Sequence, residues 1–303
     1  MVGIYHKKDL DGICSGAILK YKYPNIRLIG FDYGEELDYS LLDDETIMTD
    51  ISLPIEEMVK LSKVTKLTWI DHHISAIKDY KKYVEKHGNF CNAVLDISRS
   101  ACESTWIYMF PSEKTPQSVE LLSMYDIYKN TDKLYWENYI LPFQYGMRGR
   151  CNSVQTFSDE LFWYDELIPK IIDEGISILK FNKKQDEMLM SQTSFVLNFY
   201  GYRALCLNAG FSNSLRFESI YDESKHDVML AFQIAEEGWR FTMYTTKDTV
   251  DCSDICKMFG GGGHKKASGF GAKYVTFTKS KVIIWDKWIT RWFKNLSLKV
   301  LKY

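Results

Sequence analysis

Short apolar runs alternate with segments of helical spacing through the first half of the chain. Strands are expected over 2–5, 26–31, 46–50, 67–71 and 91–95. Helices are expected after the first, third and fourth of these strands, continuing through 17–19, starting at 52–54 and over 76–87, and a further helix is expected over 116–129. Buried strands alternating with helices are typical of a doubly wound, mainly parallel sheet. The first half is therefore predicted to be α/β, with Gly12 and Gly16 permitting a tight turn into the first helix.

The pattern changes near Ser158, where charged residues and an apolar stripe at helical spacing replace the strand pattern up to about Ser191. Strands then return over 202–207, 228–232 and 239–244, the last two as a hairpin, before a short helix over 251–258. We expect an N-terminal domain over 1–157, a helical linker over 158–194, and a smaller α/β C-terminal domain over 195–278. A basic, aromatic C-terminal helix is expected over 279–303.

Composition limits the classes of protein to which the chain can belong. Its 303 residues suffice for two domains, and 46% hydrophobic residues fit a folded globular protein. A formal net charge of −2 gives no global attraction for nucleic acid, so an anionic substrate must be met by local cations or by metal. Seven scattered cysteines suit a reducing compartment, and no signal peptide or membrane span is evident. We expect a soluble cytoplasmic protein.

Acidic residues and histidines follow three of the predicted strands. His6, Asp9 and Asp11 follow the first, Asp50 the third, and Asp71, His72 and His73 the fourth. A parallel sheet gathers the carboxyl ends of its strands at one edge, where ligands bind. Carboxylates suit Mg²⁺ or Mn²⁺, while imidazole favours Mn²⁺, Fe²⁺ or Zn²⁺. Helix caps and a solvated strand-to-helix loop are the structural alternatives, but capping does not explain His6 and both nearby aspartates together.

Two further stretches contain residues suited to a binding site. Asp126 lies among apolar and aromatic residues of a predicted helix, where a metal, an ion pair or a helix cap would serve as its partner. Gly260, Gly261, Gly262 and Gly263 precede His264, Lys265 and Lys266. Consecutive glycines expose backbone N–H groups, and a helix is predicted to begin after them, so the stretch predicts an anion-binding loop. A flexible linker is the alternative. Zinc at Cys252, Cys256 and His264 is disfavoured because four-ligand spacing is absent.

Taken together, these motifs resemble the DHH phosphoesterase family with its glycine-rich DHH-associated C-terminal domain. They occur in the family's order, and they are His6-x-x-Asp9-x-Asp11-Gly12, Asp50, Asp71-His72-His73, Asp126 and Gly260-Gly-Gly-Gly-His264. The resemblance runs from the first strand to about Phe270. It implies a phosphodiesterase or phosphatase, dependent on two Mn²⁺ ions or on Mg²⁺ or another divalent metal, that acts on nucleotides or short oligonucleotides.

The resemblance also implies a role for each matched residue. His6 and Asp9 would bind one metal, Asp11, His72 and Asp126 the other, and Asp50 would bridge the two. Asp71 would orient an imidazole, and His73 would contact the scissile phosphate or protonate the leaving oxygen. The four glycines and His264 would hold the rest of the nucleotide.

Two departures from the family pattern bear on the substrate. The spacing from His6 to Asp9 differs by one residue from several family versions. Enzymes of this family that degrade very short RNAs carry an arginine in the strand before the glycine loop, whereas this chain has Thr242-Met-Tyr-Thr245, in which Tyr244 could stack on a base.

The expected reaction is hydrolysis of a phosphodiester or terminal phosphate. The alternatives are a cyclic dinucleotide phosphodiesterase, a RecJ-type single-strand exonuclease using the basic C-terminal segment, and a nucleotide-binding sensor without turnover. The expected partner is a nucleotide or short oligonucleotide, no membrane is involved, and a homodimer is compatible with the sequence.

Overall fold

The computed structural model describes residues 1–210, 212–277 and 282–285. The chain divides into two compact units, Met1–Lys180 and Phe181–Tyr303, and the division falls within the long helix α8 (Ile168–Thr193). Helix α8 occupies most of the stretch in which the sequence predicts a connecting helix. Within the described residues, every helix is too short or too polar to cross a lipid bilayer.

Five parallel strands form the sheet of the first unit, in the order β2-β1-β3-β4-β5. The strands are β1 (Val2–His6), β2 (Arg27–Phe31), β3 (Glu45–Thr49), β4 (Lys66–Asp71) and β5 (Asn92–Leu95). The strand order reverses between β1 and β3, and in such sheets ligands bind at this switch point, beyond the carboxyl ends of the strands. The predicted α/β fold with a parallel N-terminal sheet is confirmed.

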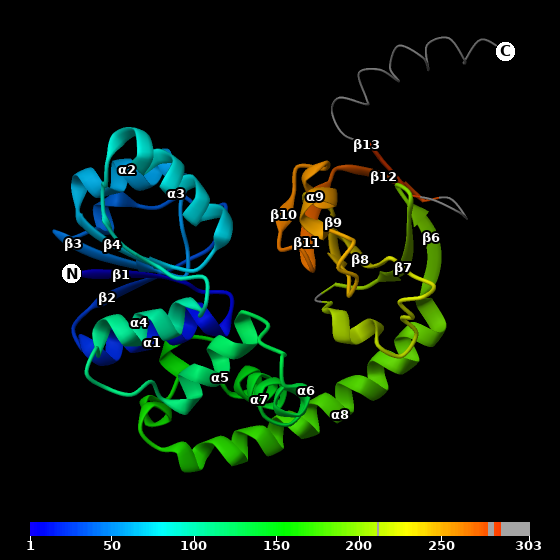
Figure 1. The fold of residues 1–303 in the computed structure, drawn as a ribbon, viewed down its shortest axis with the longest axis horizontal. Coiled ribbons are helices and arrows are strands. Elements are labelled where there is room, and N and C mark those ends of the chain that lie inside the picture. The colour runs from blue at the N-terminus through cyan, green and yellow to red at the C-terminus, as the bar shows by residue number, and fades with distance from the viewer. Residues whose placement is uncertain (211, 278–281, 286–303) are drawn as a thin grey trace, which may run out of the picture. The chain divides into compact units, whose positions relative to one another are not determined.

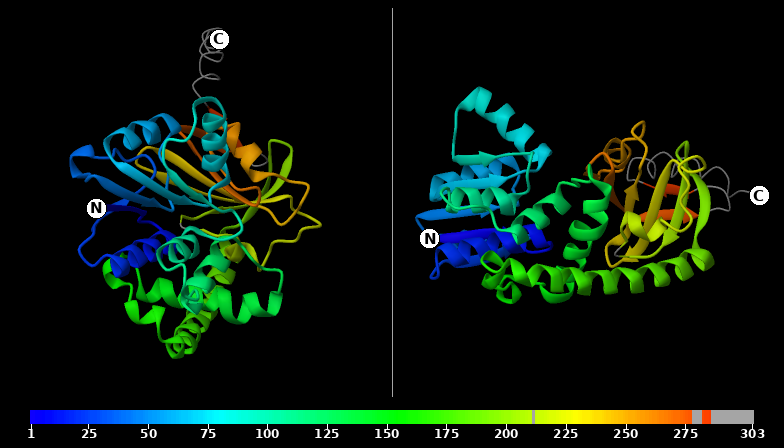
Figure 2. Two further views of the ribbon diagram at one scale, coloured as in Figure 1. Left: turned by 60° about the vertical axis from the view of Figure 1, so that its left-hand side comes forward. Right: turned by 60° about the horizontal axis from the view of Figure 1, so that its bottom comes forward.

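Helices cover both faces of this sheet, with α2 and α3 on one face and α1 and α4 on the other (Figures 1 and 2). The helices of the first unit up to α7 are α1 (Leu10–Lys22), α2 (Ile55–Val64), α3 (Ile74–His87), α4 (Ala101–Met109), α5 (Gln117–Asp126), α6 (Lys133–Tyr135) and α7 (Leu141–Arg150). Alternate strand residues serve the two layers, so that Ile4 packs toward α2 and α3 while Tyr5 packs toward α1 and α4.

Gly12 does not make the tight turn that the sequence suggests. Because α1 already begins at Leu10, Gly12 lies in the first turn of the helix and Gly16 in the second. A Cβ atom on Gly12 would lie 2.0 Å from the backbone oxygen of His6. The glycine therefore allows α1 to approach the end of β1, which places the two elements that carry His6, Asp9 and Asp11 side by side.

The stretch from 132 to 150 is helical although no element was expected there. After α6 comes a π-helix, Trp136–Ile140, which continues directly into α7. Its pattern is hard to detect in the sequence because apolar and polar residues follow each other without a clear period of 3.6.

The second unit has a six-stranded sheet in the order β10-β11-β9-β8-β7-β6, with only β7 and β8 parallel. Its strands are β6 (Phe195–Phe199), β7 (Tyr202–Asn208), β8 (Val228–Ala235), β9 (Gly238–Tyr244), β10 (Gly262–Gly263) and β11 (Ala267–Ala272). Helix α9 (Cys252–Lys257) packs on one face through Ile255, and Met190 of α8 packs on the other. Strand β6 was not expected from the sequence.

Two expectations about the second unit are wrong. No helix begins after the glycines, because the chain turns at His264 and returns as β11, so that Gly262 pairs with Gly269 and Gly263 with Ser268. Val282–Trp285 forms strand β13, paired with β12 (Tyr274–Phe277), in place of the start of a helix. Three consecutive β-branched residues favour that strand. The rest of the predicted C-terminal helix lies outside the described residues.

We predict that Gly12→Ala lowers the free energy of unfolding by about 3 kcal/mol, because the new methyl group meets backbone that cannot move independently of β1. Gly149→Ala in α7 is the matched control, since its Cβ meets only the tip of the flexible Ile178 side chain. Helix propensity should make that change neutral or stabilising by about 0.5–1 kcal/mol. Urea unfolding of both variants measures the difference, and equal stabilities would contradict the close-packing role of Gly12.

Candidate metal centre

His6, Asp9 and Asp50 form one group of side chains that converge beyond the carboxyl ends of β1 and β3. His6 Nδ1 lies 2.8 Å from Asp9 Oδ2 and 3.6 Å from Asp50 Oδ2. One ligand atom from each residue lies within 4.8 Å of the others. The switch point of the sheet thus brings together residues that the chain separates by more than forty positions.

A second group consists of Asp11, His72 and Asp126, again with one ligand atom of each within 4.8 Å of the others. His72 Nε2 lies 3.2 Å from Asp126 Oδ2 and 3.6 Å from Asp11 Oδ2. The carboxylates come from the first turn of α1 and the last residue of α5, and the imidazole follows β4. The structure therefore brings together all six residues for which the sequence predicts metal ligation.

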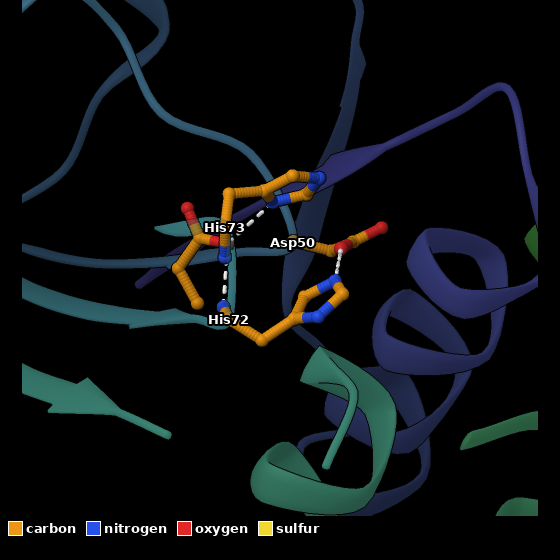
Figure 3. A group of neighbouring side chains, drawn as sticks. Asp50, His72 and His73 are labelled. Carbon is orange, nitrogen blue, oxygen red and sulfur yellow. Dashed lines mark hydrogen bonds and ion pairs between the residues drawn. The ribbon is translucent and has the colours of Figure 1, made fainter. Parts of the chain in front are cut away.

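Asp50 lies between the two groups. One of its carboxylate oxygens, Oδ2, lies 3.6 Å from His6 Nδ1, and the other, Oδ1, lies 3.4 Å from His72 Nε2. Figure 3 shows the His72 ring directed at the Asp50 carboxylate. Asp50 is buried and adopts a φ of 60°, a left-handed conformation that a residue with a Cβ rarely takes. The local strain is compensated by the hydrogen bond from Asp50 N to Ile70 O at 3.0 Å.

The carboxylate of Asp11 is held by the amino terminus of α4. Its Oδ1 accepts hydrogen bonds from Ser100 Oγ and Cys102 N, and its Oδ2 accepts one from Ala101 N. Ser100 occupies the cap position of α4, but its side chain makes no capping hydrogen bond to that helix. A carboxylate from α1 caps α4 instead, and the positive end of the α4 dipole stabilises its charge.

Asp71 fixes the position of His73. Its Oδ1 accepts hydrogen bonds from the backbone N–H of His72 at 2.7 Å and of His73 at 3.1 Å, and it lies 2.7 Å from Nδ1 of the His73 ring. Asp71 is fully buried. The motif resemblance implies that Asp71 orients an imidazole, and this role stays a prediction that the contact supports.

The charges of this site act strongly on one another. Burial raises the pKa of Asp50, and the carboxylates of Asp11 and Asp9 raise it further. Desolvation and the Asp11 carboxylate raise the pKa of Asp126 to about 7. Burial alone would lower the pKa of His6, but the carboxylates of Asp50 and Asp9 outweigh it and raise the pKa to about 10. A cation bound here would relieve this repulsion between carboxylates.

The donor set fits divalent metal ions. His6 Nδ1 and Asp50 Oδ2 are buried, and although they lie near each other, neither makes a contact with hydrogen-bond geometry among the described residues. Buried polar atoms without such partners are rare unless an ion or water completes them. Carboxylate oxygens with a minority of imidazole nitrogens match the preferences of Mn²⁺ and Mg²⁺ better than those of a thiolate-bound metal. Cys252 and Cys256 are residues of α9 that pack in the core, and neither belongs to a possible metal-binding group of the described residues.

Two neighbours of the site were missed in the sequence. Asp32 follows β2, and its Oδ1 lies 3.4 Å from His6 Nε2, on the side of the ring opposite Asp9. The rule that acids at strand ends converge would have found it. Tyr33 is 53% exposed, with its ring edge-on to His6 at 5.7 Å and to His73 at 6.4 Å between centroids. No sequence motif marks Tyr33.

The predicted substrate-binding residues lie in the second unit. Gly260 and Gly263 have φ values of 77° and 138°, and a Cβ on Gly261 would lie 2.1 Å from Gly269 O. A Cβ on Gly262 would meet no atom within 4 Å. His264 closes the turn, its N–H donating to Ala267 O. A left-handed backbone explains glycine at positions 260 and 263, and a close contact explains it at 261. Neither reason applies to Gly262.

Tyr244, the candidate for base stacking, is partly buried on β9. Its ring packs against the core that includes Met190, Leu205 and Phe217, and its hydroxyl donates to Ser212 O. Its role in substrate binding stays a prediction.

No family model matches the chain. It is 24% identical over 271 residues to "Uncharacterized protein R106" of Acanthamoeba polyphaga mimivirus, an alignment that covers 88% of this chain and 57% of that protein. It is 24% identical over 308 residues to "Oligoribonuclease NrnB" of Bacillus subtilis, covering 89% of this chain and 72% of the relative. The chain thus spans little more than half the length of the mimivirus protein.

Two solved structures share the fold. An exopolyphosphatase-related protein from Bacteroides fragilis has a TM-score of 0.54 at 14% identity, with 98% of this chain and 91% of that chain covered. RecJ in complex with Mn²⁺ from Thermus thermophilus has a TM-score of 0.53 at 13% identity, with 89% of this chain and 49% of that chain covered. At this identity the solved structures show a shared fold, and the resemblance to the DHH phosphoesterase family rests on the motifs of the sequence.

Proposed function

We propose that the chain is a divalent-metal-dependent phosphoesterase that hydrolyses phosphodiester or terminal phosphate bonds of small nucleotides or short oligonucleotides. The main support is the position of Asp50, whose two carboxylate oxygens each face a different group of ligand residues. Two metal ions sharing one carboxylate is the arrangement used for phosphoryl hydrolysis. The name of the Bacillus subtilis relative, an oligoribonuclease, agrees with such a substrate.

His6, Asp9 and Asp50 would hold one ion, and Asp11, His72 and Asp126 the other, with Asp50 shared. Bound there, Mn²⁺ or Mg²⁺ would polarise the phosphoryl oxygens and lower the pKa of a bound water. The ions would also neutralise the four carboxylates of a site that would otherwise repel phosphate.

His73 is proposed to act on the substrate directly. Burial lowers its pKa, but the Asp71 carboxylate raises it by more, so the imidazolium form is favoured. In that form the ring carries a second N–H that can donate to a phosphoryl oxygen or protonate the leaving oxygen. Asp71 would act through His73, by keeping Nδ1 engaged and the ring fixed in orientation.

The glycine loop is proposed to bind the nucleotide part of the substrate, together with His264 and Tyr244. The backbone of Gly262 is not left-handed and has space beside it, so a steric reason for glycine there must come from a ligand. Lys265 and Lys266 follow in the same turn and would add positive charge. Each of these roles remains a proposal.

Metal binding should depend on pH in a defined direction. In the metal-free protein the raised pKa of Asp126, about 7, means that the folded state binds more protons than the unfolded state between about pH 4 and 7. The contribution of Asp126 to the free energy of unfolding is therefore lost as the pH rises through that range. The contribution of His6 is lost in the same way as the pH rises from its ordinary pKa to about 10. Because ions displace these protons, the gain in Tm from Mn²⁺ should be larger at about pH 8.5 than at about pH 5.5.

Thermal unfolding with Mn²⁺ and with chelator at the two pH values measures this gain. Asp126→Asn should reduce both the gain and its pH dependence. Asp79→Asn, which changes an exposed aspartate of α3, should behave like the unchanged protein. The same gain at both pH values would argue against carboxylate and imidazole ligands.

The activity itself is tested with dinucleotides. We expect Mn²⁺-dependent release of mononucleotide, reduced by roughly 10³-fold or more in Asp50→Ala and His72→Ala, because each substitution removes a proposed ligand. Asp79→Asn should retain activity. Undiminished hydrolysis in the presence of chelator would refute the proposal, and tight nucleotide binding without hydrolysis at any metal concentration would favour a sensor.

Gly262→Ala tests the glycine loop. We expect an unchanged Tm, since the methyl group meets open space, and a KM for dinucleotide raised roughly tenfold, equivalent to about 1.4 kcal/mol. Gly149→Ala in the first unit should leave KM unaltered. An unchanged KM in Gly262→Ala would remove this loop from the substrate-binding residues.

A further inference from the structure

Three residues other than glycine adopt a left-handed backbone among residues 1–210, 212–277 and 282–285. They are Asp50, Tyr128 and Tyr200, with φ values of 60°, 53° and 50°. Each is unfavourable for a residue with a Cβ, so each calls for a reason. Asp50 belongs to the metal centre. Tyr200 and Gly201 form the two-residue turn between β6 and β7, where both φ values must be positive, and the Tyr200 hydroxyl accepts a hydrogen bond from Ile284 N.

The left-handed backbone of Tyr128 belongs to the end of a helix. It follows the last turn of α5, where its N–H donates to Tyr125 O and the N–H of Lys129 donates to Met124 O. This pair of hydrogen bonds is the Schellman motif, which ends helices and strongly favours glycine at the position that Tyr128 occupies. Local stability therefore favours glycine at 128, and the tyrosine side chain must have another role.

The ring of Tyr128 is 59% exposed, yet it is part of an aromatic ladder formed by Tyr128, Trp136 and Tyr125. Tyr128 lies edge-on to Trp136 at 5.0 Å between centroids, and Trp136 stacks nearly parallel to Tyr125 at 5.6 Å. Trp136 opens the π-helix, a type of element that is frequent at functional sites. The rings of Tyr125 and Trp136 are thus fixed by packing, while the ring of Tyr128 is exposed to solvent.

The aromatic ladder is connected to the metal centre through the end of α5. Asp126, a residue of the second ligand group, is the last residue of α5 and lies between Tyr125 and Tyr128 in the chain. At the other end, the guanidinium of Arg148 lies 5.4 Å from the centre of the Tyr125 ring. Lys129 adds a further cation next to Tyr128. Exposed aromatic rings beside cations are the surface that single-stranded nucleic acids bind, through stacked bases and paired phosphates.

We infer that Tyr128 stacks on a nucleobase of the substrate, next to the scissile phosphate at the metal centre. The inference rests on the proposed function and narrows its substrate class. Under the proposed function the glycine loop holds one nucleotide, so a second base stacked on Tyr128 requires a phosphodiester that joins two nucleosides. A dinucleotide or short oligonucleotide should therefore be preferred over a nucleotide with only a terminal phosphate. Stacking tolerates any base, so little sequence preference is expected.

The variant Tyr128→Gly separates function from stability. Glycine suits the Schellman position, so its Tm should equal or exceed that of the unchanged protein. Its kcat/KM for a dinucleotide should fall about tenfold, mainly through KM, while Tyr128→Phe should keep the activity because the ring remains. Tyr164→Ala, which removes a similarly exposed ring far along the chain, is the control and should have no effect.

Two abasic analogues of the dinucleotide, each lacking one base, complete the test. If Tyr128 stacks on a base, the unchanged protein should cleave the analogue that lacks this base poorly. Tyr128→Gly should cleave that analogue as well as the unchanged protein does. An equal loss on the intact dinucleotide and both analogues, or no loss at all, would overturn the inference.

If the unchanged chain cleaves none of the compounds, the proposed function fails but the stacking is still tested. Calorimetric binding of the dinucleotide and its analogues in the presence of Mn²⁺ should then show the same selective weakening in Tyr128→Gly. Equal binding by the two proteins, or binding by neither, would refute the role of Tyr128.

Discussion

Buried carboxylates converge beyond the carboxyl ends of β1 and β3, and their mutual repulsion is the constraint to which much of the first unit is fitted. Two unit charges 4 Å apart interact by about 4 kcal/mol at the effective dielectric of a protein surface. The structure offsets this repulsion in a different way at each residue. Asp11 is stabilised by the amino terminus of α4, Asp71 by backbone N–H groups, and Asp9 by His6, whose proximity outweighs burial and lowers its pKa. Asp50 is fully buried and its Oδ2 makes no hydrogen bond among the described residues, which makes it a carboxylate that requires a cation.

The sequence predicts those parts of the fold that depend on local patterns. Apolar runs locate β1 to β5, and the acids that follow β1, β3 and β4 converge because parallel strands end at one edge. The cap of α4 could not be predicted in this way. Asp11 and Ala101 are 90 positions apart, so a search for caps next to the helix finds Ser100 instead. Asp32 was missed for a simpler reason, since its strand was recognised but its end was not considered.

The glycine stretch shows the opposite error, in which a local pattern suggested an element that the tertiary structure overrides. Glycines followed by lysines and Ala267 resemble an anion-binding turn that leads into a helix. In the folded chain, β9 supplies a partner strand for 267–272, and six consecutive residue pairs join them. Pairing across strands of this length fixes the extended conformation whatever the local preference. Near the end of the described chain the pairing is local, because β13 pairs with the preceding strand β12 where the sequence suggests a helix.

The ligand groups are spread over a long stretch of chain, from His6 to Asp126, and this has a consequence for biosynthesis. A nascent polypeptide that has emerged only as far as His73 carries most of the imidazoles and acids but lacks both the α4 terminus and the last carboxylate. Neutralisation of Asp11 cannot occur on the ribosome before α4 is made, and closure of the second group must wait for the end of α5. The first group, by contrast, is complete once Asp50 has been made, so the two groups become available for a cation at different stages of synthesis.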